Sequence, residues 1–161
     1  MGVPAQTRTA SENIPVSVFV TSVGEDPFYA GVAGVGDQPI GISQEWQKGP
    51  PGVSGAVTYA AESGDQFRLY GVANERALLI FGAVCPAGAL VKPMAGGLGT
   101  PVVANNALQY FGARALEAVV QSQVTNGNPV EVETWFGQVN PGTSTTTTTT
   151  STTTTTTTTG A

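Results

Sequence analysis

The amino-acid sequence predicts a mainly β protein: a small antiparallel β-barrel or β-sandwich module with an extended N-terminal arm and a threonine-rich C-terminal tail. The apolar runs are short and are separated by Gly, Pro and Asn, which is the pattern of strands joined by tight turns. Only 11% of the residues are charged, whereas 21 are Gly and 11 are Pro. This composition favours turns and strands over long amphipathic helices.

The clearest predicted strand spans residues 14–23 (IPVSVFVTSV), in which valines alternate with the residues of the other face. The motif Glu25-Asp26-Pro27 that follows predicts a solvated turn. Further strands are expected at 28–35, 39–43, 56–61, 66–72 and 77–84, the last being a continuous apolar run that predicts a buried strand.

Residues 104–124 fit two secondary structures. Apolar side chains recur at helical spacing between 108 and 119, which predicts a helix. Gly112 lies in the middle of this run and favours a strand, because glycine weakens a helix interior. A turn at 126–127 and an alternating strand from Val130 are expected to follow.

The chain is expected to contain one domain between two tails. Residues 1–13 are polar and irregular and predict a flexible arm, 14–140 form the β-rich domain, and 141–161 form the tail. Similar short motifs occur twice and suggest an internal duplication of 14–75 and 84–137. The alternative is a chance likeness between two sheet edges.

The tail is almost a pure threonine tract, PGTSTTTTTTSTTTTTTTTGA. Threonine is polar and β-branched, so the tract cannot form a packed core and its side chains favour an extended backbone. Three states are compatible with this composition: a flexible stalk, a tail ordered by bundling with copies of itself, and a glycan-bearing tail.

Charge and targeting signals limit the partners. The net charge is −5 and the six basic residues are scattered, so we expect no nucleic-acid partner. No apolar run approaches the length of a transmembrane helix, and the N-terminus lacks the apolar segment of a secretory signal. We therefore expect a protein that is made in the cytoplasm and has no membrane partner.

No pattern in the sequence predicts catalysis, a cofactor or a metal. Cys85 is the single cysteine and the chain has no histidine to activate it, so a small buried apolar residue is the simplest interpretation. Glu131 and Glu133 share one face of a predicted strand, where paired carboxylates could act as acid and base. The solvated face of an amphipathic strand explains the same spacing.

Four motifs within residues 84–136, about a third of the chain, carry a family resemblance. They are AGALVKP at 87–93, the glycine pair at 96–97, FGARALEA at 111–118 and GNPVEV at 127–132. In this order they resemble the tailed-bacteriophage capsid cement (decoration) proteins. The resemblance implies a small, usually trimeric β-module and makes 111–118 a strand.

The resemblance also implies a function. Such a protein would bind the outside of a phage capsid as a homotrimer and stabilise the shell by bridging major capsid proteins, without a reaction or a cofactor. The virion would be assembled in the host cytoplasm and released by lysis, which fits a chain without an export signal. The threonine tail lies outside the family pattern and makes a head fibre or spike a close alternative. Another virion module and a carbohydrate-binding surface module, which would use Trp46, Trp135 and Tyr59, are further alternatives.

Two tryptophans are the strongest candidates for an interface. Trp46 and Trp135 each lie beside polar residues, which fits either the lid of a core or an anchor at an interface. Phe136, Ile14 and Pro15 complete the set of predicted interface residues.

Overall fold

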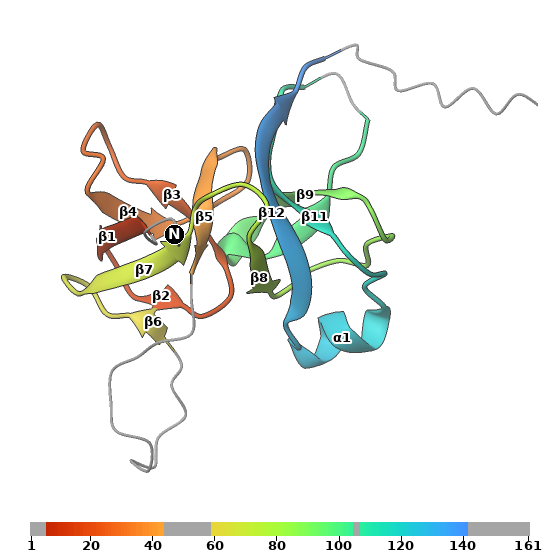
Figure 1. Cartoon of the computed structure of the whole chain (residues 1–161), viewed down its shortest axis with the longest axis horizontal. Helices are drawn as coiled ribbons and strands as arrows, with labels where there is room; N and C mark the ends of the chain where they lie inside the picture. The colour runs from red at the N-terminus through yellow and green to blue at the C-terminus, as the bar shows by residue number, and fades with distance from the viewer. Residues whose placement is uncertain (1–5, 44–58, 105–106, 142–161) are drawn as a thin grey trace, which may run out of the picture.

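The structure, a computed structural model, describes residues 6–43, 59–104 and 107–141. Two β-rich lobes lie side by side, with the N-terminal strands in one lobe and the C-terminal strands in the other (Figure 1). The predicted fold class is confirmed, because the chain is mainly β and contains a closed five-stranded barrel.

The first lobe is that closed barrel. Its strands follow the order β1-β4-β3-β5-β7, and β1 is parallel to β4 and antiparallel to β7. A two-stranded sheet of β2 and β6 accompanies it. The strands are β1 (Gln6–Ala10), β2 (Ile14–Pro15), β3 (Phe19–Ser22), β4 (Tyr29–Val32), β5 (Pro39–Ser43), β6 (Tyr59–Ala61) and β7 (Gln66–Tyr70).

The second lobe is a five-stranded sheet whose two edges meet. Its order is β10-β9-β11-β12-β8, and a parallel bridge between Phe81 and Gly99 joins the chain after β8 to β10. The N–H of Gly99 donates to the carbonyl of Ile80 (2.8 Å), and the N–H of Gly82 donates to the carbonyl of Gly99 (3.0 Å). The elements are β8 (Arg76–Leu79), β9 (Leu90–Pro93), η1 (Ala95–Gly97), β10 (Gly99–Pro101), β11 (Gln109–Ala115), α1 (Gln121–Asn126) and β12 (Val130–Val139).

The two lobes have the same topology. If the strands of each five-stranded sheet are numbered along the chain, both follow the circular order 1-3-2-4-5. In both, the first strand pairs with the fifth in antiparallel orientation. The first strand also meets the third in parallel, in the second lobe through Phe81 just after β8. A duplication would produce this arrangement, but the segments 14–75 and 84–137 inferred from the sequence each omit the first strand of a lobe. Duplication itself stays a prediction.

The lobes share a core. One buried cluster lies within the first barrel and includes Val20 and Leu69. The other is centred on the second lobe but also contains Phe19 and Ile42 of the first. Neighbouring residues of a strand point to opposite faces, so Val20 points into the first barrel while Phe19 packs against the second lobe. Complete burial of the Phe19 side chain contributes about 1.5–3 kcal/mol to stability.

The single strand predicted over 14–23 is wrong. The backbone breaks at Ser17, which has φ 58°, and this separates β2 from β3. Ser43 stabilises the break: its hydroxyl donates to the carbonyl of Pro15 (2.7 Å) and accepts the N–H of Val18 (3.1 Å). Residues 77–84 are likewise not one buried strand, because β8 ends at Leu79 and Leu78 is exposed.

The predicted flexible arm needs a similar correction. Residues 6–10 form β1, which closes the first barrel by pairing with β4 and β7. Backbone hydrogen bonds on both sides compensate for the polar sequence QTRTA, which has no apolar run of its own. Residues 1–5 and the threonine tract at 143–159 lie outside the described part of the chain.

The ambiguity over 104–124 is resolved as a strand followed by a short helix. β11 covers most of the FGARALEA motif, so the strand interpretation is confirmed there. The helix α1 begins only at Gln121. The turn predicted at 126–127 is the end of this helix, where Gly127 adopts the left-handed conformation.

We expect Gly97→Ala to destabilise the fold more than Gly96→Ala. Both residues have positive φ, which costs an alanine about 1–2 kcal/mol. A Cβ on Gly97 would also lie 2.6 Å from the Phe19 carbonyl oxygen, whereas nothing lies within 4 Å at Gly96. The total cost at Gly97 should reach about 2–4 kcal/mol. Urea unfolding of the two variants measures the difference, and equal stabilities would contradict the close contact between the lobes.

Candidate interaction surface

The exposed tryptophan of the second lobe lies in a β-bulge. Phe111 pairs with Gly137 and Ala113 pairs with Thr134, so Gly112 lies opposite both Trp135 and Phe136. A bulge changes the direction in which the following side chains point. Trp135 is 43% exposed on the outer face, Phe136 is half-buried, and Thr134 is completely buried.

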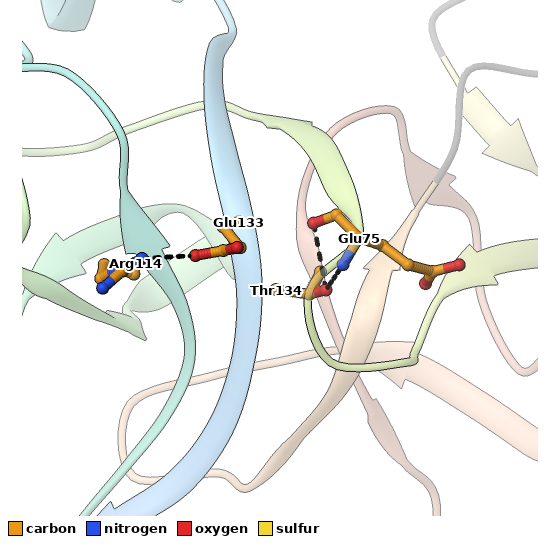
Figure 2. A network of polar contacts seen from close by, with 4 residues as sticks. All are labelled: Glu75, Arg114, Glu133 and Thr134. Atoms are coloured by element: carbon orange, nitrogen blue, oxygen red, sulfur yellow. Dashed lines mark hydrogen bonds and ion pairs between the residues drawn. The ribbon is translucent and has the colours of Figure 1, made fainter.

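Two ion pairs lie on the outer face of the sheet, which also carries Trp135. The Arg114 guanidinium contacts the Glu133 carboxylate at 2.7 Å (Figure 2) and lies 5.6 Å from the centre of the Trp135 ring. Arg76 pairs with Glu131 at 3.0 Å. Because these groups are exposed to solvent, each pair contributes at most about 1 kcal/mol to stability. The two carboxylates that the sequence placed on one face are thus each held by an arginine.

Thr134 fixes the connection between the lobes from the inner side of β12. Its hydroxyl accepts the N–H of Glu75 at 2.9 Å (Figure 2) and donates to the carbonyl of Val72. Its backbone N–H donates to the carbonyl of Glu75 and its carbonyl accepts the N–H of Asn74, both at 2.8 Å. The segment between β7 and β8 is thereby tied to the strand that carries Trp135.

The predicted interface residues lie in separate places. Trp135 and Phe136 are neighbours on β12 of the second lobe, whereas Ile14 and Pro15 form β2 of the first. Ile14 is completely buried in the first core, so its side chain is not available at the surface. The prediction that Ile14 is an interface residue is therefore corrected. Pro15 is half-buried, and Trp46 lies outside the described residues.

Sequence reasoning missed a second exposed group at the tip of the β3–β4 hairpin. Val23, Phe28 and Tyr29 are all exposed there. The sequence placed Phe28 at the start of a strand, whereas β4 begins at Tyr29 and Phe28 belongs to the preceding loop. The signal available in the sequence was an aromatic residue directly after the turn motif Glu25-Asp26-Pro27.

Cys85 lies where the sequence placed it, in a buried apolar position. It forms a two-residue bridge with Val119, and the N–H of each donates to the carbonyl of the other. Burial raises the pKa of the Cys85 thiol, because the charged thiolate loses its hydration. The thiol therefore stays protonated, and its contribution to stability is lost only as the pH rises above the usual thiol pKa.

Metal binding and membrane crossing were considered for the part of the chain that the structure describes. Across 6–43, 59–104 and 107–141, no three His, Cys, Asp or Glu side chains gather in a way that could hold a metal ion. Within the same residues, no helix has both the length and the apolar character required to cross a membrane.

We expect Thr134→Val to lower the free energy of unfolding by about 1–3 kcal/mol, because the Glu75 N–H and the Val72 carbonyl lose a buried partner. Thr134→Ser keeps the hydroxyl and loses one methyl group, about 0.8 kcal/mol. Denaturant unfolding of both variants provides the comparison. A valine variant as stable as the serine variant would show that the hydrogen bonds contribute little.

We also expect iodoacetamide at pH 8 to alkylate Cys85 much more slowly in the folded protein than in urea. The buried thiol is both inaccessible and protonated, while alkylation requires the thiolate. Mass spectrometry of timed samples measures the two rates. Similar rates would mean that this part of the core opens readily.

Comparison with known proteins gives one informative result. No protein-family model matches the sequence, and no curated protein matches it. Among solved structures, the fold is similar to that of the head fiber gp8.5 N base of bacteriophage phi29, with a TM-score of 0.51 and 15% sequence identity. The match covers 81% of this chain and 92% of that chain, so the similarity of fold extends over both lobes.

Proposed function

We propose that this chain is a structural virion protein that binds the outside of a phage capsid as an oligomer. One observation carries the proposal: the fold is similar to that of the base of a phage head fibre over 81% of this chain. The sequence motifs that resemble capsid cement proteins point to the same location by a separate route. They lie on β9, β11 and the start of β12, within the second lobe.

The proposed mechanism is mechanical. Each homotrimer would bridge several major capsid proteins, so the area buried at each contact would add to the stability of the shell. Three linked copies bind far more tightly than one, because attachment of the first raises the effective concentration of the others. The shared core suits this role, since it makes the two lobes one packed body that can transmit force.

A head-fibre base is the second form of the proposal, and the structural comparison favours it over a simple cement protein. After β12 the sequence continues into a threonine-rich segment, which a fibre base could carry as the start of an appendage. A carbohydrate-binding platform is supported less well. Two of its proposed residues, Tyr59 on β6 and Trp135 on β12, belong to different lobes.

The test is binding of the purified chain to phage shells that lack it, together with its mass by light scattering. We expect a trimer that sediments with the shells. A rise in the melting temperature of the shells would support the cement form, whereas binding without such a rise would support the fibre base. A monomer that stays in the supernatant would refute both forms.

A further inference from the structure

The β3–β4 tip, residues 23–29, is an exposed apolar protrusion on the first lobe. Phe28 is 70% exposed, and Val23 and Tyr29 on either side of the hairpin are exposed as well. Exposed large apolar side chains that gather at one place typically mark a site of interaction, whereas scattered ones do not. The exposure of these apolar side chains therefore points to a contact outside the core of the protein.

The backbone of the tip is held in place. The N–H of Phe28 donates to the carboxylate of Asp26 at 2.9 Å, and its carbonyl accepts the N–H of Thr9 on β1 at 2.8 Å. The N–H of Val23 donates to the carbonyl of Tyr29 at 3.2 Å. Both backbone groups of Phe28 are thus bonded while its side chain projects outward. A residue fixed in this way loses little conformational entropy when it binds.

Three acidic side chains lie in or close to the tip. Glu25 and Asp26 belong to the tip itself. Glu12 approaches it from the loop after β1: its Oε1 atom and a methyl group of Val23 lie 2.9 and 3.0 Å from the position that a Cβ on Gly31 would take. The Glu12 carboxylate is fixed there by the N–H of Val32 at 2.8 Å.

The first lobe as a whole is acidic. Its described residues, 6–43 and 59–70, include six acidic and two basic side chains, a net charge of −4. An identical tip on a second copy would repel this one, since both tips carry Glu25 and Asp26 with Glu12 close by. Charge complementarity therefore favours a different protein with a positively charged contact surface.

We propose that the β3–β4 tip is the anchor by which this protein binds the capsid shell. Phe28 enters an apolar pocket of a shell protein, and basic side chains at the rim of that pocket face Glu12, Glu25 and Asp26. Aromatic residues that fill a pocket inside a charged rim are the usual energetic centre of protein interfaces. This inference rests on the proposed function, since it names the contact through which the shell is bound.

The test compares Phe28→Ala with Val35→Ala on the same shells that lack the protein. Val35 is also exposed but follows β4, whereas Phe28 precedes it, so the control removes exposed apolar surface at the other end of the strand. We expect Phe28→Ala to weaken shell binding at least about tenfold and Val35→Ala to leave it unchanged. Both variants should keep the oligomeric state of the wild type, measured as mass by light scattering, and its melting temperature, because neither residue is part of the core.

A second variant tests the charge of the partner. Glu25→Gln with Asp26→Asn removes two charges but leaves an amide oxygen that can still accept the Phe28 N–H. We expect weaker binding at low salt and a smaller loss of binding as salt is raised, because fewer attractive charges remain to be screened. An unchanged salt dependence would overturn the basic rim.

The outcomes separate the two proposals. If the wild type binds shells and Phe28→Ala binds equally well, the anchor is refuted while the virion function stands. If the wild type does not bind shells at all, the proposed function and the anchor are refuted together.

Discussion

The close approach of the two lobes around Phe19 is the constraint on which the rest of the structure depends. Phe19 belongs to a strand of the first barrel, yet its ring is buried in the core of the second lobe. Two glycines of the second lobe make this close approach to Phe19 possible. A Cβ on Gly112 would lie 2.7 Å from the Phe19 ring, and one on Gly97 would lie 2.6 Å from the Phe19 carbonyl oxygen. The two lobes therefore form one packed unit.

This shared core determines where the surfaces lie. The Thr134 hydroxyl holds the segment between the lobes against β12, and Trp135, the next residue of the strand, lies on the opposite, exposed face. At the far end of β3, the hairpin tip with Phe28 extends away from the contact between the lobes. A rigid body with exposed groups at separate places suits a protein that connects partners, since contacts at different sites add only if the body between them does not bend.

The carboxylates near Trp135 and those near Phe28 have different hydrogen-bond and ion-pair partners. On the face of β12 that carries Trp135, Glu131 and Glu133 are each paired with an arginine, so these charges balance. Near Phe28 the carboxylates of Glu12 and Asp26 instead accept backbone N–H groups, from Val32 and from Phe28 itself. A carboxylate held in this way keeps its negative charge available to a partner. This difference in the partners of the carboxylates, rather than exposed apolar area alone, is why we propose the hairpin tip as the part that contacts a basic surface of another protein.

The sequence by itself determined the fold class, the strand at 39–43 and the buried position of Cys85, because these follow from local periodicity and composition. Only the tertiary structure decided the rest. The strand β1 has no apolar pattern and exists because β4 and β7 bond to it on both sides. Alternation in the segment 14–23 predicted two different faces, but Phe19 and Val20, on opposite faces of β3, are both buried, one in each core. Which apolar side chains remain outside, Phe28 among them, depends on how the strands assemble, and strand pairs such as β1 with β4 join residues far apart in the chain.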